Sequence, residues 1–264
     1  YAMLADPLRY MGHPSFSGLL LRHTTEELRE LIYKSKEIYP QIWKGIKWSE
    51  RKMQWEAPSG ARLWMSYLDR DDDVLRYQGL AFSWIGFDEL TQWSTPYAWN
   101  YMRSRLRSTA QDLPVYMRAT TNPGGPGHQW VKKMFIDPAP YGRKFDATDI
   151  ESGNVLSYPK GHTKAGQPLF KRRFIPARLS DNPYLAAQGD YETMLLSLPE
   201  HQRKQLLDGD WDIKEGAAFT EFDRNIHVIE PFAIPRNWVK FRACDYGYGS
   251  YSGVLWFAVS PDEQ

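Results

Sequence analysis

The stretch Leu80-Ala-Phe-Ser-Trp-Ile-Gly-Phe-Asp-Glu89 decides the fold of this chain. Up to the acids it is almost continuously apolar, which is typical of a parallel strand covered on both faces by other elements. The run ends abruptly in two neighbouring acids, Asp88 and Glu89. Open α/β sheets bind ligands at the carboxyl ends of their strands. The sequence therefore predicts a central strand over 80–87 with both acids at the ligand-binding edge.

Segments on either side of this strand complete an α/β pattern. The apolar run Ser17-Gly-Leu-Leu-Leu-Arg22 predicts a second buried strand. A helix is expected over 26–37, with Thr24 or Thr25 as its cap. Further expected elements are a hairpin over 47–68 with its turn at 57–60, a helix over 97–108 and a strand over 114–121. Strand, helix and strand with apolar centres predict a mainly parallel sheet flanked by helices.

The rest of the chain is expected to be less regular. Asp69-Arg-Asp-Asp-Asp73 is a charge run that favours a solvated loop over a metal site. Gly, Pro and polar residues over 137–170 indicate a long irregular excursion. Other expected elements are a starting helix over 1–10 shortened by Pro7, a strand over 174–178, two helical segments over 182–205, and strands over 239–245 and 253–259.

Composition excludes several classes of protein. The chain has 264 residues, of which 42% are apolar and 25% charged, as in ordinary globular proteins. Its net charge of +1 gives no overall basic excess of the kind that marks many nucleic-acid binders, although basic residues cluster at 103–107 and 171–173. The single cysteine, Cys244, excludes an internal disulfide and fits a reducing compartment. No apolar stretch of about 18 residues occurs, so no membrane span is expected.

The two acids fit the chemistry of nucleotide hydrolysis. An enzyme that hydrolyses ATP must hold Mg²⁺ and orient a water molecule in line with the γ-phosphate. Asp88 is placed to hold the metal and Glu89 to activate the water, because neighbouring side chains at a strand tip point in different directions. This is the Walker B pattern with an adjacent catalytic glutamate. Taken alone, the same pair also fits the start of an ordinary helix.

A second polar segment supports the hydrolytic interpretation. Thr120-Thr-Asn-Pro-Gly124 follows the next predicted strand. Hydroxyl and amide groups at a strand tip can bond the γ-phosphate or its water, and glycine lets the loop move. The alternative is a plain turn, since Asn-Pro and Gly-Gly are turn formers. The sequence holds no phosphate-binding loop of the form G-x-x-x-x-G-K-[ST].

In this order, the segments resemble a known family. The chain resembles the large terminase subunit of tailed bacteriophages, an ATP-driven DNA-packaging motor. The resemblance is carried by Tyr1-Ala-Met-Leu-Ala-Asp-Pro-Leu-Arg-Tyr10, Arg76-Tyr-Gln-Gly79, Trp84-Ile-Gly-Phe-Asp-Glu89, Thr120-Thr-Asn-Pro-Gly124, Asp181-Asn-Pro-Tyr184, Leu198-Pro199, Leu207-Asp-Gly-Asp-Trp211 and Phe241-Arg-Ala-Cys-Asp-Tyr-Gly247. These look like the helix after the Walker A loop, the Walker B block, the coupling motif, the end of the ATPase domain and the first nuclease strand.

The resemblance implies an ASCE-type P-loop NTPase fold followed by the start of an RNase H-like nuclease domain, truncated at both ends. It divides the chain into an ATPase domain over 1–211 that lacks its Walker A loop, a linker or subdomain over 212–235, and the first nuclease strands over 236–264. The implied cofactors are ATP and Mg²⁺, with Mn²⁺ as an alternative at the nuclease site.

Roles for single residues in the ATPase domain are implied by position. Asp88 would hold Mg²⁺ through water, and Glu89 would activate the attacking water. Asn122 would couple hydrolysis to domain movement. The neighbours that would share nucleotide binding and coupling with it are Thr120, Thr121 and Gly124.

Two further residues have implied roles elsewhere in the chain. Asp245 would be the first ligand of a two-metal nuclease site. Arg76 is the nearest candidate for the family's arginine finger, although Gln78 stands directly before Gly79, where some members place the arginine.

Partners and location follow from the same resemblance. The implied partners are double-stranded DNA, the small terminase subunit, the portal protein of the procapsid and further copies of the chain in a homo-oligomeric ring. The chain would act in the cytoplasm of the bacterial host, transiently on the procapsid, with no membrane involved. Two other hypotheses stay open: a helicase-like P-loop ATPase without a nuclease, and a catalytically degenerate module that docks or binds DNA.

Overall fold

The computed structural model describes residues 1–177, 181, 190–199, 203–212, 229, 232–246 and 253–261. The chain divides into two compact units, Tyr1–Glu215 and Gly216–Gln264. Among the described residues, no helix has both the length and the apolar character needed to cross a lipid bilayer.

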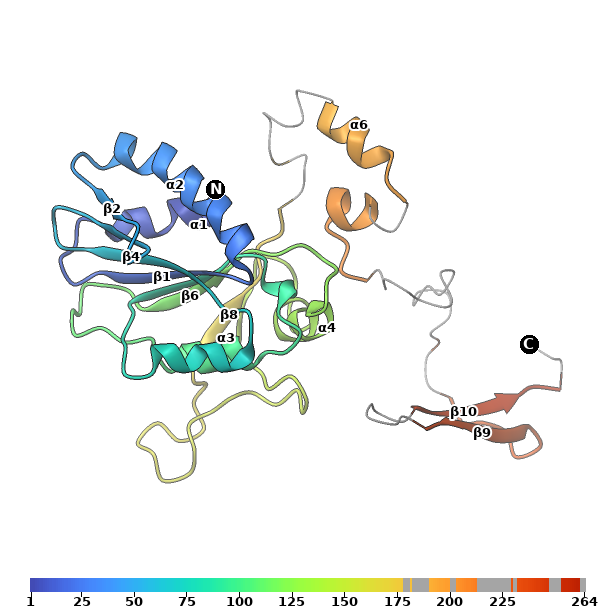
Figure 1. The fold of residues 1–264 in the computed structure, drawn as a ribbon. Helices are drawn as coiled ribbons and strands as arrows, with labels where there is room; N and C mark the ends of the chain where they lie inside the picture. The colour runs from blue at the N-terminus through green and yellow to red at the C-terminus, as the bar shows by residue number, and fades with distance from the viewer. Residues whose placement is uncertain are drawn as a thin grey trace. The chain divides into compact units, whose positions relative to one another are not determined.

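The first unit is built on a six-stranded sheet with helices on both faces (Figure 1). Its strands are β1 (Ser17–Arg22), β2 (Lys47–Ser49), β3 (Gln54–Glu56), β4 (Arg62–Tyr67), β5 (Trp84–Phe87) and β6 (Tyr116–Ala119), with β7 (Lys144–Asp146) and β8 (Lys171–Arg173) in a separate ladder. Its α-helices within the described residues are α1 (Ala2–Ala5), α2 (Thr25–Ile42), α3 (Tyr97–Arg103), α4 (His128–Val131) and α6 (Asp190–Leu196). The 3₁₀- and π-helical turns in the same described part are η1 (Pro7–Tyr10), η2 (Asp71–Tyr77), η3 (Leu90–Gln92), η4 (Lys132–Ile136) and η6 (Lys204–Asp208).

The main sheet is mostly parallel, as the sequence predicts. Its strand order is β2-β3-β4-β1-β5-β6, in which β4, β1, β5 and β6 run parallel and β2 and β3 form an antiparallel edge. The register places Leu21 beside Phe87 and Phe87 beside Ala119. The residues that follow β5 and β6 therefore emerge at one edge, next to Arg22 at the end of β1. The predicted α/β fold class is confirmed.

Two apolar layers sandwich the sheet, and β1 supplies both. Leu20 belongs to the layer under α1 and α2, whereas Leu19 and Leu21 belong to the layer formed with α3 and α4. All four residues of β5 are buried. Burial on both faces is what a central parallel strand requires, so the strand that precedes Asp88 is packed from both sides.

Helix α2 begins where the sequence predicts and ends later. The Thr24 hydroxyl accepts the Glu27 N–H at 3.3 Å, and the Glu27 carboxylate accepts the Thr24 N–H at 3.3 Å, which is a complete capping box. The predicted end at 37 is too early. Tyr39 is fully buried and its hydroxyl donates to the Leu4 carbonyl at 2.8 Å, so packing against α1 extends the helix.

Three central elements are shorter than their sequence patterns indicate. The strand predicted over 80–87 is observed only as β5, the helix predicted over 97–108 only as α3, and the strand predicted over 114–121 only as β6. A parallel bridge between Phe82 and Leu106 explains the first two differences. It draws the residues before β5 and after α3 into an isolated contact, outside the main ladder.

The acidic run over 69–73 was predicted to be a solvated loop, and this was wrong for 71–73, which are helical. The turn η2 begins at Asp71. The Asp73 carboxylate accepts the backbone N–H groups of Asp69 and Arg70, each at 3.0 Å. This side chain satisfies amides that the start of a helical turn leaves unpaired, which is why the charges form a turn.

The excursion over 137–170 is largely irregular, as expected, but the strand predicted over 174–178 was wrong. The paired strand is β8, antiparallel to β7. Pro176 has no N–H with which to join a ladder, whereas Arg172 in β8 is buried and its Nη1 donates to the Thr148 carbonyl at 2.8 Å. The helices predicted over 182–205 lie partly outside the described residues, as does most of the segment 212–235.

The second unit contains the two strands that the sequence predicts. Strands β9 (Val239–Asp245) and β10 (Gly253–Val259) form an antiparallel pair in which Asp245 lies opposite Gly253. Whether this pair starts an RNase H-like domain stays a prediction.

Candidate functional site

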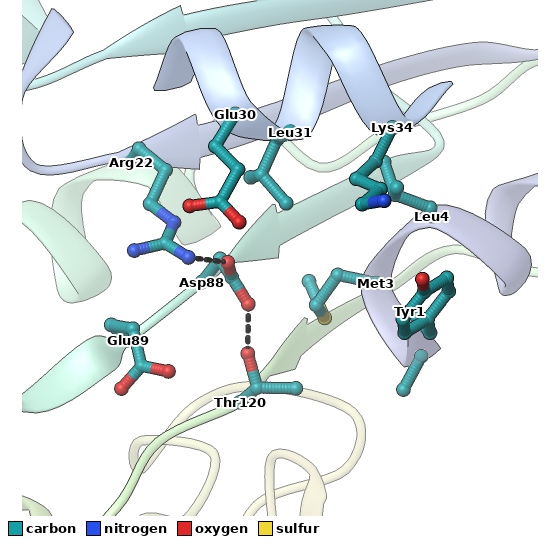
Figure 2. Close-up of a pocket in the computed structure, with 11 residues that line it drawn as sticks. Tyr1, Met3, Leu4, Arg22, Glu30, Leu31, Lys34, Asp88, Glu89 and Thr120 are labelled. Carbon is teal, nitrogen blue, oxygen red and sulfur yellow. Dashed lines mark hydrogen bonds and ion pairs between the residues drawn. The ribbon is translucent and has the colours of Figure 1, made fainter. Parts of the chain in front are cut away.

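Asp88 lies at the carboxyl edge of the main sheet, directly after β5 (Figure 2). Arg22, the last residue of β1, places its Nη2 atom 2.7 Å from Oδ2 of Asp88. The hydroxyl of Thr120, the residue after β6, donates a hydrogen bond to the other carboxylate oxygen. Both oxygens of this buried carboxylate are therefore held, one from each neighbouring strand.

Glu89 adopts a backbone conformation that residues other than glycine rarely take. Its φ of 58° lies in the left-handed region. The turn sets its carboxylate apart from that of Asp88, as Figure 2 shows. Burial raises the pKa of Glu89 above its ordinary value, and Asp88 raises it further, while Arg22 lowers it. A carboxylate with a raised pKa is a stronger proton acceptor, which suits a general base.

Asp88 and Glu89 line a pocket of about 370 Å³ at this edge (Figure 2). The other lining residues are Tyr1, Ala2, Met3, Leu4, Arg22, Glu30, Leu31, Lys34 and Thr120. Oxygen donors such as those of Asp88 and Thr120 are the ligands that Mg²⁺ takes. Cations such as Arg22 and Lys34 are the groups that bind phosphate.

The donor set fits a magnesium ion that is shared with a phosphate ligand. The described residues contain no cluster of three or more His, Cys, Asp or Glu side chains that could enclose a metal. Mg²⁺ at phosphate sites needs no such cage, because one or two carboxylates, water and the phosphates complete its shell. A single buried carboxylate at Asp88 therefore suffices.

The loop after β6 is fastened to Thr91, which lies two residues beyond Glu89. The Thr91 N–H donates to Thr121 Oγ1 at 3.1 Å, and the Thr91 hydroxyl donates to the Asn122 carbonyl at 3.2 Å. The Gly127 N–H donates to the Thr91 carbonyl at 2.7 Å. The Asn122 backbone lies close enough to the Glu89 carboxylate to lower its pKa slightly against the larger effect of burial. The loop is thus fastened to the segment that follows the second acid.

Comparison with known proteins gives matches in structure. No protein family and no curated protein matches the chain in sequence. The large terminase of the thermophilic bacteriophage D6E, solved in complex with ADP, matches with a TM-score of 0.55 and 17% identity over 98% of this chain. The same terminase in complex with ATP-gamma-S matches with a TM-score of 0.53 and 15% identity over 98% of this chain.

The chain has the fold of a large terminase. It spans 56% of the length of the ADP-bound terminase. The resemblance seen in the sequence motifs is therefore confirmed at the level of the fold, and the roles of single residues remain to be proposed.

In this terminase fold, the predicted site residues do not all meet at the pocket. Thr120 lines it together with Asp88 and Glu89. Thr121, Asn122 and Gly124 do not line it. Thr121 and Asn122 bond Thr91 instead, and the Gly124 N–H donates to His128. The Asn122 side chain is exposed.

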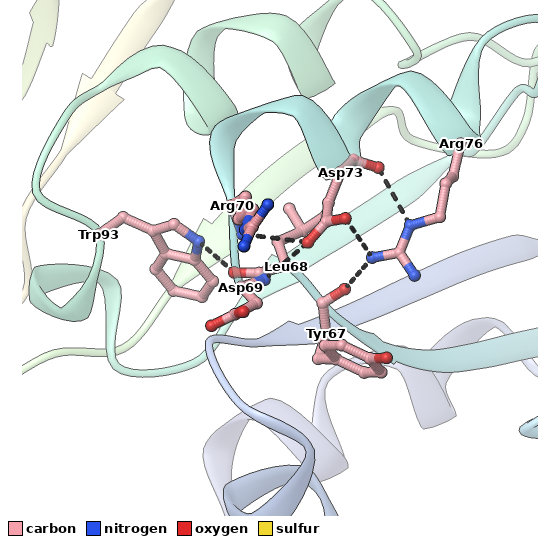
Figure 3. Close-up of polar contacts among 7 residues, drawn as sticks. All are labelled: Tyr67, Leu68, Asp69, Arg70, Asp73, Arg76 and Trp93. Atoms are coloured by element: carbon pink, nitrogen blue, oxygen red, sulfur yellow. Dashed lines mark hydrogen bonds and ion pairs between the residues drawn. The ribbon is translucent and has the colours of Figure 1, made fainter.

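Arg76 lies on η2, outside the residues that line the pocket (Figure 3). Its Nη2 donates to the Tyr67 carbonyl at 2.9 Å and lies 3.4 Å from the Asp73 carboxylate. Its guanidinium also stacks on the Tyr67 ring, 5.2 Å from the centroid. Despite these contacts, 46% of its side chain is exposed.

Asp245 belongs to the second unit of the terminase-like chain. It ends β9 and is exposed. The residues that would complete a two-metal site with it are not among the described ones.

Sequence reasoning missed two side chains that organise the site, namely Arg22 and Thr91. One signal for Arg22 was available: a lone cation ends an otherwise apolar strand of the same sheet. Thr91 has no such signal, because its contacts come from loop geometry.

Proposed function

We propose that this chain is the ATP-hydrolysing part of a large terminase, the motor subunit that drives double-stranded DNA into a procapsid. The observation that carries the proposal is the placement of Asp88 and Glu89 at the carboxyl end of the central strand, on one pocket with Thr120. The terminase fold, and a terminase of that fold solved in complex with ADP, support it.

Each residue of the pocket has a task in this proposal. Mg²⁺, when bound, neutralises charge on the phosphates. Asp88 would hold the hydrated ion, and the Thr120 hydroxyl fixes the orientation of that carboxylate. Glu89 accepts a proton from the attacking water, for which its raised pKa suits it.

The same proposal gives the loop over 120–127 its role. Thr91 connects this loop to Glu89, so a change at the γ-phosphate displaces both together. Motion of the loop would then be passed to the rest of the motor, which is the coupling role proposed for Asn122 and its neighbours.

The second unit would begin the nuclease that cuts concatemeric DNA, with Asp245 as a ligand for Mg²⁺ or Mn²⁺. The proposed partners are the small terminase subunit, the portal protein and identical subunits in a ring. These proposals rest on the fold and on the motif order, and each needs its own test.

The deciding experiment uses the full-length protein and the variant Glu89→Gln. We expect nucleotide binding to persist and ATP turnover to fall about a hundredfold or more, because the general base is lost. The matched control is Glu26→Gln, an exposed acid in the first turn of α2, which should leave turnover unchanged. Unchanged hydrolysis in Glu89→Gln would remove Glu89 from its role.

Two results would favour the competing hypotheses. A wild-type protein that neither binds nor hydrolyses ATP would support a degenerate docking module. ATP-driven strand separation without DNA cleavage would support a helicase-like enzyme.

A further inference from the structure

His128 is a buried histidine whose two ring nitrogens face different parts of the chain. It is 7% exposed, and it opens α4 directly after the loop over 120–127. Its Nδ1 accepts the Gly124 N–H at 2.8 Å. Its Nε2 lies 3.1 Å from the carbonyl oxygen of Trp211.

These contacts fix the tautomer of the ring. A backbone N–H can only donate, so Nδ1 must be unprotonated. A carbonyl can only accept, so Nε2 must carry the hydrogen and donate it to Trp211. The neutral ring is therefore a bridge with a defined polarity, from the Gly124 amide to the Trp211 carbonyl.

Trp211 is held on α4 by more than this bond. Its ring stacks on that of His128, with centroids 5.2 Å apart and an interplanar angle of 24°, and it is only 3% exposed. One turn further along, Lys132 forms an ion pair with Asp212 at 3.1 Å. Lys132 begins η4, four positions after His128, so the two side chains lie on one side of adjacent helical turns. They contact Trp211 and Asp212, the last described residues of the first unit.

The segment before Trp211 contacts the same loop a second time. Gln205 in η6 is 7% exposed, and its amide lies against Gly124: a Cβ on that glycine would come within 3.3 Å of the amide. The Nε2 of Gln205 has no hydrogen-bond partner within the described part of the chain. A buried donor without a hydrogen-bond partner raises the free energy of the folded state. A second position of the loop that offered this amide an acceptor would therefore compete with the position seen here.

We infer that His128 is the positioning residue that transmits the state of the nucleotide site to the segment 205–212. The route runs from Glu89 through Thr91 to the loop, and from Gly124 through His128 to Trp211. This inference rests on the proposed function, because it needs a nucleotide to move the loop. To that function it adds His128 as the residue that passes the movement of the loop on to the segment 205–212.

Three substitutions separate the two halves of the bridge. His128→Asn keeps an acceptor near the Nδ1 position and loses the bond to Trp211. His128→Gln keeps a donor near the Nε2 position and loses the bond to Gly124. His128→Phe keeps the ring stack and loses both bonds. Lys132→Gln is the control, because it removes the ion pair to Asp212 and leaves the histidine bridge intact.

The test is hydrogen exchange of the full-length protein with and without ATP-gamma-S, followed in peptides that cover 122–128 and 205–212. In the wild type and in Lys132→Gln, both segments should change protection. In the three His128 variants, the change at 122–128 should persist and the change at 205–212 should be lost.

Each contrary outcome has its own meaning. If 205–212 still responds in His128→Asn and His128→Phe, the bridge is not the route and the inference is overturned. If the wild type binds ATP-gamma-S and only 122–128 changes, the inference fails while the proposed function stands. If the wild type shows neither binding nor any change, both fail. A variant that unfolds is recognised by complete exchange in β1 and β5, and the other two variants then decide.

Discussion

Arg22 and Asp88 form an ion pair of 2.7 Å that joins the ends of two adjacent parallel strands. Only 18% of the arginine side chain and 11% of the aspartate side chain are exposed, so the pair is mostly removed from water. The arginine therefore occupies the carboxylate that the proposed function assigns to Mg²⁺. In the absence of nucleotide, the cation and the metal should compete.

The substitution Arg22→Gln tests this competition. It leaves Asp88 without its charge partner, and we expect the free energy of unfolding to fall by about 3 kcal/mol. Added Mg²⁺ should recover part of this loss, because it binds the freed carboxylate in the folded state. Urea unfolding with and without Mg²⁺ measures both effects. Arg29→Gln, at an exposed position of α2, is the control. Equal stabilisation of the wild type and the variant by Mg²⁺ would contradict the competition.

Glu89 should lower the stability of the fold through its backbone. Its φ of 58° strains any residue with a Cβ. We expect Glu89→Gly to be more stable than Glu89→Gln by about 1 kcal/mol, since only glycine removes the strain. Both variants should lack ATP turnover. Thermal or urea unfolding of the two proteins gives the comparison, and a less stable glycine variant would show that the turn is not strained.

The sequence was enough to predict the main strands and the helix that surround this site. The apolar run before Asp88 predicted a central strand, and the cap at Thr24 predicted the start of α2. Such features are local, because burial on both faces and capping leave their pattern in a few adjacent residues. The chain order of strand, helix and strand then limited the topology to a mainly parallel sheet.

The remaining details depend on contacts between distant parts of the chain. The bridge between Phe82 and Leu106 shortens two elements whose own residues give no sign of it. The left-handed turn at Glu89 is likewise absent from the local pattern, because glutamate is a poor residue for that conformation. The bond from His128 to Trp211 joins segments that no motif connects.

Gly127 is expected to tolerate no side chain. A Cβ there would lie 2.1 Å from the carbonyl oxygen of Trp93, which is backbone and also accepts the Trp130 indole N–H at 2.7 Å. We expect Gly127→Ala to lower the free energy of unfolding by about 3 kcal/mol, because the loop must move away from η3. Gly12→Ala, whose Cβ would meet only the ring of Trp43 at 3.2 Å, should cost much less. Urea unfolding compares the two, and equal losses would mean that the loop adjusts freely.

Asp245 allows a test of the second unit that is independent of the first. In the full-length protein, Asp245→Ala should abolish DNA cleavage and leave ATP turnover largely intact, because the residue would act only as a nuclease metal ligand. Cleavage of plasmid DNA in Mg²⁺ or Mn²⁺ and phosphate release measure the two activities. Lys240→Gln, on the same strand, is the control. Cleavage by Asp245→Ala at the wild-type rate would place the nuclease site elsewhere.

Arg76 provides the test of action between subunits. Its contacts to Tyr67 and Asp73 lie at the surface, so Arg76→Ala should change the stability of the monomer little. If it serves the pocket of a neighbouring subunit, ATP turnover of the assembled ring should fall about a thousandfold while nucleotide binding persists. Arg70→Ala is the matched control, because Arg70 also precedes β5 and bonds Asp73 only through its backbone.

Mixed rings decide whether Arg76 acts in trans. Subunits with Arg76→Ala keep an intact Glu89, and subunits with Glu89→Gln keep an intact Arg76. When the two inactive proteins are mixed, interfaces that pair the intact Glu89 of one with the intact Arg76 of the other should regain turnover. Recovery that depends on the mixing ratio identifies Arg76 as the finger. No recovery, together with normal assembly, would assign the role to another cation.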